Sequence, residues 1–275
     1  MVKATIIDYL QTECTALIAA HDKLLTQPRN ASAVHEQRVG VKKLRAFFAL
    51  TDNIPHLSFK HSRYLNKLRV LQSIAGIARD AQLQSRALTT IEKQEGWRFS
   101  YAHFLLQERQ EVAAELLTTA SKRLKPGTLK EVPGVFRQKL EKVREETLME
   151  ELLAYIDSQY REIASPDVRA GHAAWHEVRK QMKTVFYQLT ILQPILPPEP
   201  HYKQMLAYSK RAGELLGGWH DLTVLHLFVQ DTIRKAKKES MPVPVKAMRL
   251  LKTLRQNAQE ELALSAAYLH KKSLD

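Results

Sequence analysis

The chain has 275 residues, of which 44% are hydrophobic and 26% charged, and its 42 lysines and arginines outnumber its 29 aspartates and glutamates by 13. This composition excludes a disordered or fibrous protein, because it is sufficient for a buried core in one large or two small domains. The single cysteine, Cys14, excludes an internal disulfide framework, and no apolar run reaches the ~18 residues of a membrane span.

The first half of the sequence has helical periodicity divided by breaker residues. We expect helices over about 3–26, 32–52, 59–76, 80–96 and 100–123, with Ser32 as the N-cap of the second. Gly76 and Gly96 are expected to end helices, and Asp80 to cap the helix that follows Gly76. Lys125-Pro126-Gly127 and Pro133-Gly134 mark the expected junction between two halves of the chain.

The second half follows the same rhythm. We expect helices over about 135–164 and 167–193, then from His201 to Gly217, from Asp221 onward, and after Pro244, with Asp167 as an N-cap. We find no alternating strand pattern, so the predicted fold is all-α: two antiparallel helical bundles related by pseudo-two-fold symmetry. The whole chain, 1–275, is expected to form a single module with repeat halves 1–127 and 128–275.

Two motifs recur at a constant separation in the sequence. His, Arg and Lys stand at positions 35, 38 and 42 and again at 176, 179 and 183, and 176 − 35 = 179 − 38 = 183 − 42 = 141. Gly76-x-x-Arg79-Asp80 and Gly217-x-x-His220-Asp221 keep the same offset, since 217 − 76 = 141. Two blocks in one register indicate a duplicated helical unit.

The first motif places a row of cations on one helical face. His35, Arg38, Lys42 and Arg45 fall within an arc of roughly 80°, beside an apolar stripe. A solvated basic face is the alternative interpretation, but the second row and the excess of positive charge favour an anionic partner. Two such rows would form a basic groove suited to a long anion. The candidate binding residues are His35, Arg38, Lys42, Lys43, Arg45, Arg63, Lys67, Arg69, Arg79, His176, Arg179, Lys180, Lys183, Lys210, Arg211 and His220.

Two other classes of function remain open. A nucleic-acid-binding protein would suit the charge, but Phe47 and Phe48 resemble core residues, which leaves Tyr187 as the candidate stacking aromatic. A metal-dependent enzyme acting on phosphate chains is less favoured, because Asp80 and Asp221 are isolated carboxylates. His172 and His176 lack a third ligand nearby in sequence, so we expect no metal site and no cofactor.

These motifs give the chain a resemblance to a known family. The segments His35-x-x-Arg38-x-x-x-Lys42-Lys43-x-Arg45 and His176-x-x-Arg179-Lys180-x-x-Lys183, with the two Gly-x-x-x-Asp blocks, resemble the conserved histidine α-helical domain (CHAD) family over essentially the whole chain. The resemblance implies two helical bundles and non-catalytic binding of inorganic polyphosphate by basic residues in a central groove. The Glu-x-Glu-x-Lys signature of the triphosphate-processing domain fused to some members is missing.

The chain departs from the family pattern in the second repeat. Thr184, Val185 and Phe186 stand where more basic residues are usual, and His220 replaces an amide residue. Because histidine titrates near neutrality when unperturbed, we expect stronger anion binding toward pH 6. With Asp8, Gln11 and Glu13 interrupting the N-terminal apolar residues, we expect no signal peptide and a cytoplasmic location, with polyphosphate granules as one destination. The sequence leaves the oligomeric state open.

Overall fold

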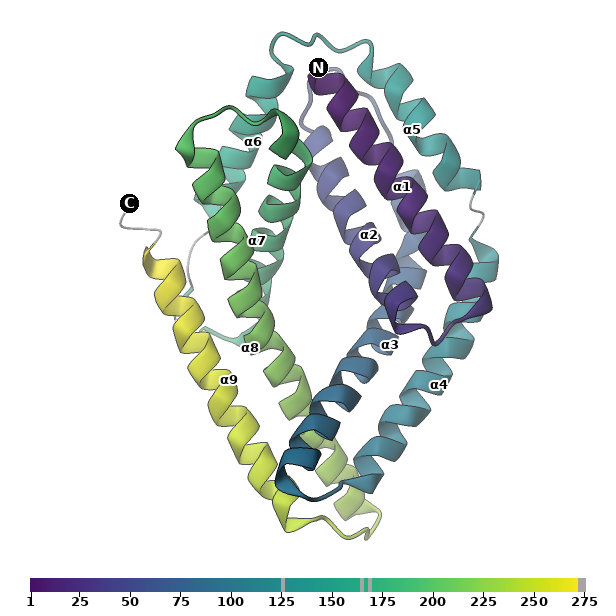
Figure 1. Cartoon of the computed structure of the whole chain (residues 1–275), viewed down its shortest axis with the longest axis vertical. Coiled ribbons are helices and arrows are strands. Elements are labelled where there is room, and N and C mark those ends of the chain that lie inside the picture. The colour runs from purple at the N-terminus through teal and green to yellow at the C-terminus, as the bar shows by residue number, and fades with distance from the viewer. Residues whose placement is uncertain (125–126, 164–165, 168–169, 272–275) are drawn as a thin grey trace. The chain divides into compact units, whose positions relative to one another are not determined.

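The computed structural model describes residues 1–124, 127–163, 166–167 and 170–271 (Figure 1). Over these residues the chain forms nine α-helices and one short 3-10 helix, and no strand occurs among them. The all-α fold class is therefore confirmed. The elements are α1 (Val2–Thr26), α2 (Ala31–Thr51), α3 (Ser62–Glu95), α4 (Ser100–Arg123), α5 (Gly127–Leu140), α6 (Leu148–Glu162), α7 (His172–Leu192), η1 (Gln193–Ile195), α8 (Pro200–Lys238) and α9 (Val245–Lys271).

The expected breaks at Gly76 and Gly217 are wrong. Helix α3 continues through Gly76 and Asp80, and α8 continues through Gly217 and Asp221, so neither glycine ends a helix and neither aspartate caps one. A glycine inside a helix costs about 1 kcal/mol, which tertiary packing readily offsets. The predicted end at Gly96 is confirmed, since α3 ends at Glu95 and Gly96 has a φ of 64°.

Other helix boundaries also differ from the sequence prediction. The N-cap of α2 is Asn30, not Ser32, and the Asn30 side chain accepts hydrogen bonds from the backbone N–H groups of Ser32 and Ala33. Pro133 lies inside α5, and the single helix expected over 135–164 is divided between α5 and α6. Asp167 is not an N-cap, because α7 begins at His172. Residues 125 and 126 of the predicted junction lie outside the described part of the chain.

The chain divides into two compact units by contact between Cα atoms. Unit 1 comprises Met1–Gly76, Ala114–Ala164 and Lys180–Lys210. Unit 2 comprises Ile77–Ala113, Ser165–Arg179 and Arg211–Asp275. Helices α3, α4, α7 and α8 each contribute to both units, and each unit draws on both halves of the sequence. The repeat halves 1–127 and 128–275 and their pseudo-two-fold relation stay predictions.

Unit 1 has a core in which α1 packs against α2 and α5. The rings of Phe47 and Phe48 lie 5.3 Å apart between centroids, and Phe136 lies 5.2 Å from both Phe47 and Phe59. Phe47 and Phe48 are almost fully buried, which confirms their predicted core role. Cys14 is also buried in this unit, and burial together with the negative charge of Glu13 raises the pKa of its thiol to about 12.

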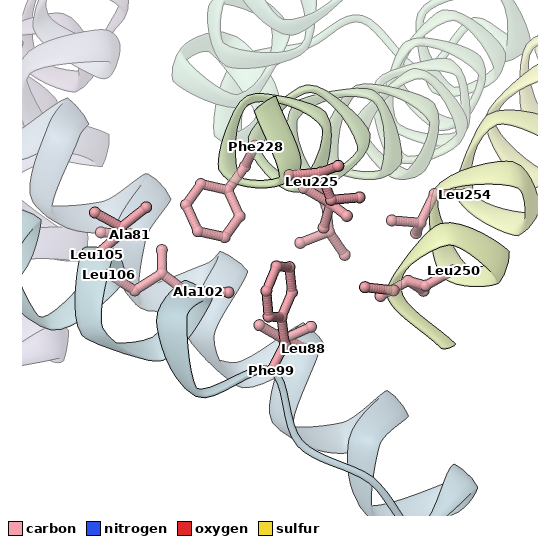
Figure 2. Close-up of a cluster of buried hydrophobic side chains, with 13 residues drawn as sticks. Ala81, Leu88, Phe99, Ala102, Leu105, Leu106, Leu225, Phe228, Leu250 and Leu254 are labelled. Carbon is pink, nitrogen blue, oxygen red and sulfur yellow. The ribbon is translucent and has the colours of Figure 1, made fainter. Parts of the chain in front are cut away.

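The core of unit 2 joins α3, α4, α8 and α9 (Figure 2). Phe99 and Leu88 are fully buried opposite Phe228 and Leu250. Buried Glu92 ties the α3–α4 connection to this core. One of its carboxylate oxygens accepts the backbone N–H of Phe99 at 2.6 Å, and the other lies 2.6 Å from Nε2 of His103.

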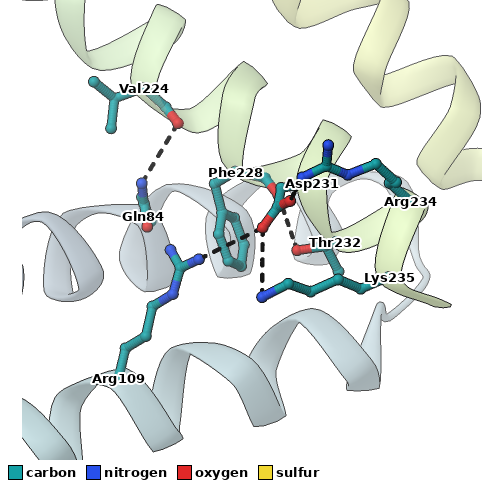
Figure 3. Close-up of polar contacts among 8 residues, drawn as sticks. All are labelled: Gln84, Arg109, Val224, Phe228, Asp231, Thr232, Arg234 and Lys235. Atoms are coloured by element: carbon teal, nitrogen blue, oxygen red, sulfur yellow. Dashed lines mark hydrogen bonds and ion pairs between the residues drawn. The ribbon is translucent and has the colours of Figure 1, made fainter. Parts of the chain in front are cut away.

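Three basic side chains contact one acidic residue near the C-terminal end of α8 (Figure 3). The Asp231 carboxylate contacts Arg234 at 2.5 Å, Lys235 at 3.5 Å and Arg109 at 3.9 Å. The Arg234 hydrogen bond lowers the pKa of Asp231, and the charges of Lys235 and Arg234 act in the same direction. Arg109 also lies over the ring of Phe228, 5.0 Å from its centroid. Arg234 and Lys235 at this helix end are therefore paired with Asp231 near the protein surface. Of the helices described, none is both long and apolar enough to span a lipid bilayer.

Candidate functional site

The first cationic row lies along α2 in unit 1. His35, Arg38, Lys42 and Arg45 keep the spacing i, i+3, i+7 and i+10 on an unbroken helix, so they share one face. His35 and Arg45 are exposed, whereas Arg38 and Lys42 are half-buried beside the core residues of the same helix. The row therefore follows the edge of the buried surface, as its sequence predicts.

A contact between α2 and α3 explains the glycine of the second motif. A Cβ atom added at Gly76 would lie 2.6 Å from Nη1 of Arg38, well inside any normal contact distance. Only glycine lets the Arg38 guanidinium lie this close to the α3 backbone. The two sequence motifs of the first half are thus in direct contact, which their spacing alone did not indicate.

Lys43 points away from this row. Its Nζ donates a hydrogen bond of 2.7 Å to Oε1 of Glu13, a nearly buried carboxylate on α1. The positive charge of Lys43 is therefore matched within unit 1, and its contact contributes to α1–α2 packing.

The second cationic row lies along α7 and is longer than predicted. His172, His176, Arg179 and Lys183 follow the spacing i, i+4, i+7 and i+11, which places them on one face. His176, Arg179 and Lys183 are half-buried, and Lys180 is exposed beside them. The sequence indicated His172 only as a possible metal ligand and not as a member of this row. Its position four residues before His176 was the signal that could have found it.

Within unit 1, α2 and α7 meet just beyond the C-terminal ends of their rows. Nε2 of Gln188 on α7 donates to the backbone oxygen of Ala46 on α2 at 3.4 Å. Ala46 stands four residues after Lys42, and Gln188 stands five residues after Lys183, so each lysine lies within about 8 Å of this contact along its own helix axis. The structure therefore brings one end of each predicted row to a shared helix–helix contact.

Three histidine rings cluster in unit 2. The ring centroids of His176 and His220 lie 5.0 Å apart, and the centroid of His172 lies 6.0 Å from His176 and 5.9 Å from His220. Residues of α7 and α8 that are far apart in sequence thus form one imidazole surface. Among the described residues, no group of three or more histidine, cysteine, aspartate or glutamate side chains has a metal-binding arrangement.

The Arg38–Gly76 contact has no counterpart at the equivalent glycine. A Cβ added at Gly217 would meet no described atom within 4 Å outside its own helix, so the guanidinium of Arg179 does not cover it. The backbone of α8 is consequently open at the position where α3 is covered by an arginine. The two Gly-x-x-x-Asp motifs therefore differ in their surroundings despite their matching sequence spacing.

The remaining predicted residues are more scattered. Arg79 and His220 are half-buried on α3 and α8, and both belong to unit 2. Nζ of Lys67 lies 3.5 Å from Oγ1 of Thr128, and Arg211 pairs with Glu214 at 3.7 Å. The exposed members of this set are Arg63, Lys67, Arg69, Lys210 and Arg211.

Comparison with known proteins identifies the family. The sequence profile of the CHAD domain matches residues 10–230, and the chain therefore belongs to the CHAD domain family. No curated protein matches the sequence.

Two solved structures share the fold at low sequence identity. PptA from Streptomyces chartreusis is 12% identical, with a TM-score of 0.71 and 99% of each chain covered. The CHAD domain from the plant Ricinus communis is 15% identical, with a TM-score of 0.71, and the match covers 98% of this chain and 92% of that one.

The Lys43–Glu13 pair predicts that loss of the Lys43 side chain destabilises the fold, whereas loss of an exposed cation of the α2 row does not. Lys43→Ala leaves the Glu13 carboxylate buried without this donor, so we expect the free energy of unfolding to fall by about 1–3 kcal/mol. Arg45→Ala, at an exposed position of the same helix, is the matched control and should change it by less than about 0.5 kcal/mol. Urea unfolding followed by circular dichroism measures both, and equal effects would contradict the structural role of Lys43.

Proposed function

We propose that this protein binds inorganic polyphosphate in a basic groove, without catalysing its breakdown or synthesis. The principal contacts are His35, Arg38, Lys42 and Arg45 from α2 and His176, Arg179, Lys180 and Lys183 from α7. His172, Arg79 and His220 add to the site. Lys43 is left out because Glu13 accepts its hydrogen bond.

The observation that carries the proposal is the contact between α2 and α7 in unit 1. The hydrogen bond from Gln188 to Ala46 anchors the two helices next to Lys42 and Lys183, the last repeated cation of each motif. A polyphosphate chain bound along one row could continue onto the other row at this contact. A single small anion would need only one of the two rows.

The spacing of the cations suits a ligand of repeating charge. Steps of three and four residues along a helix separate successive cations by about 4.5–6 Å along the axis. Arginine contributes a planar fork of donors for phosphate oxygens, and lysine contributes a mobile point charge. None of these contacts has to distinguish one phosphate from the next. Membership of the CHAD family supports the same ligand.

The first test is a competition between long-chain polyphosphate and single-stranded RNA of equal charge at physiological salt. We expect polyphosphate to bind at least about tenfold more tightly, because the proposed contacts are mainly cationic and few aromatic rings stand among them to stack on bases. The Arg38/Lys42/Arg179/Lys183→Ala variant should lose this preference. The slope of log affinity against log salt concentration should also fall by about 3, since roughly 0.7 counterions are released per neutralised phosphate.

Two partial variants sharpen this test. Arg38/Lys42→Ala removes cations from α2, and Arg179/Lys183→Ala removes them from α7; if one polymer uses both rows, each variant should weaken binding. Equal affinity of the wild type for RNA and polyphosphate would favour the nucleic-acid-binding alternative. Release of orthophosphate in the presence of Mg²⁺ or Mn²⁺, abolished by Asp80→Asn or Asp221→Asn, would instead establish a phosphate-processing enzyme.

The two equivalent glycines provide a matched pair of variants. In Gly76→Ala the new Cβ displaces the Arg38 guanidinium, so we expect polyphosphate affinity to fall about tenfold, the value of one charge-assisted contact. In Gly217→Ala the new Cβ meets open space, so affinity should stay within about twofold and stability should rise by up to about 1 kcal/mol. Isothermal titration calorimetry and thermal unfolding measure these effects, and identical losses of affinity would contradict the role assigned to Arg38.

The histidine cluster predicts a pH dependence. Protonation adds positive charge at the site and a bound polyanion favours that charge, so binding should take up protons. We expect affinity to rise at least about threefold from pH 8 to pH 6, and His176→Gln/His220→Gln should flatten this dependence. His270→Gln, an exposed histidine of α9, is the control. Retention of the full pH dependence in the double variant would remove these histidines from the site.

A further inference from the structure

Unit 2 contains a small pocket that shares His172 with the α7 row and otherwise lies apart from both cationic rows. It lies among α7, α8 and α9 and has a volume of about 200 Å³. Sites for drug-sized ligands usually occupy ~300–1,000 Å³, so this pocket suits a smaller molecule. Its lining is mainly apolar, and no carboxylate occurs among the described residues that form it.

One end of the pocket is aromatic. Trp219 of α8 and Trp175 of α7 line it together with Leu262 of α9. The ring of His172 packs on Trp219 with 4.9 Å between centroids and a tilt of 41°. Trp175 is fully buried, and its indole N–H has no hydrogen-bond partner in the described structure. This end of the pocket is therefore apolar.

The opposite end is cationic. His226 follows Trp219 by two helical turns on α8, and Arg255 precedes Leu262 by two turns on α9, so about 10 Å separates the two ends along the helices. Two observations show that α8 and α9 run antiparallel here. A Cβ atom added at Gly218 would lie 3.7 Å from Oε2 of Glu261. Toward the other end, the positive charge of Arg255, which precedes Glu261 on α9, lowers the pKa of His226, which follows Gly218 on α8.

The charge at this end comes from Arg255. Burial is the main cause that lowers the pKa of His226, and the positive charge of Arg255 lowers it further. His226 is therefore neutral at pH 7. Neutral His226 can donate or accept a hydrogen bond, and the guanidinium of Arg255 remains to pair with an anion.

We propose that this pocket binds a small organic monoanion with a flat apolar body, such as an aromatic carboxylate. The ring would lie against Trp219 and Leu262, and the carboxylate would meet Arg255 and His226. Arginine matches a carboxylate with two parallel N–H donors. Inorganic phosphate or a segment of polyphosphate fits less well, because part of its charge would be placed against the apolar walls without compensation. The proposal does not depend on polyphosphate binding.

The chain offers a direct optical readout for this pocket. Of its three tryptophans, Trp175 and Trp219 line the pocket and Trp97 does not. In a Trp97→Phe variant, whose fold is checked by circular dichroism, all tryptophan fluorescence therefore reports on the pocket. Calorimetry on the wild-type protein provides a second measurement that needs no substitution.

The test is a titration with benzoate, its neutral analogue benzamide, and inorganic phosphate. We expect benzoate to change the fluorescence saturably, and benzamide and phosphate to bind at least tenfold more weakly. Arg255→Gln should weaken benzoate binding at least tenfold. Arg249→Gln removes an exposed arginine of the same helix that does not line the pocket, and it should leave the affinity unchanged.

Three results would overturn the proposal. These are the absence of saturable benzoate binding by both methods, equal affinity for benzamide, and equal losses in the Arg255→Gln and Arg249→Gln variants. Each of these results leaves the polyphosphate titration unaffected, so a failure here can be separated from a failure of the proposed function.

Discussion

The guanidinium of Arg38 lies against the backbone of α3, and this close approach requires that Gly76 has no side chain. The contact fixes where a long, flexible cation points. An arginine held half-buried in this way has already lost part of its rotamer entropy, so less would be lost in binding the proposed polyphosphate. The packing of α2 against α1 in turn decides which face of α2, and so which members of its row, remain accessible.

The fold also has to hold like charges close together. Each such pair on a helix costs a few tenths of a kcal/mol, and the chain carries an excess of 13 positive charges. Behind the α2 row, Phe47 and Phe48 pack in the core of unit 1 and provide the burial that offsets this repulsion. Lys43 shows the other solution, in which a buried carboxylate matches the cation. Adjacent lysines on one helix thus have different physical roles.

Local patterns predicted most of the helices, because apolar periodicity and terminal breakers act within a few residues. They failed at Gly76, where the reason for glycine is Arg38 on another helix, and at Pro133, which α5 tolerates in its interior. The division between α5 and α6 falls at residues 141–147, which contain neither glycine nor proline.

The cationic residues of the candidate site could be predicted because the repeat displays them twice. Their partners could not. The association of His172 with Trp219 and His220 joins α7 to α8 across more than forty residues of sequence (219 − 172 = 47). The asymmetry between Gly76 and Gly217 depends on side-chain positions that identical motifs do not reveal. Such features follow from tertiary packing alone.

The assembly of each unit from three separate segments has a consequence for protein synthesis. Unit 1 begins at Met1 but takes its last segment from Lys180–Lys210, and unit 2 takes its last from Arg211–Asp275. As the chain leaves the ribosome, α1 and α2 emerge long before the segment that completes their unit. Contacts between such distant segments form slowly, because a long loop must close before they stabilise anything. The nascent chain therefore carries partly uncovered apolar helix faces until translation has passed residue 210.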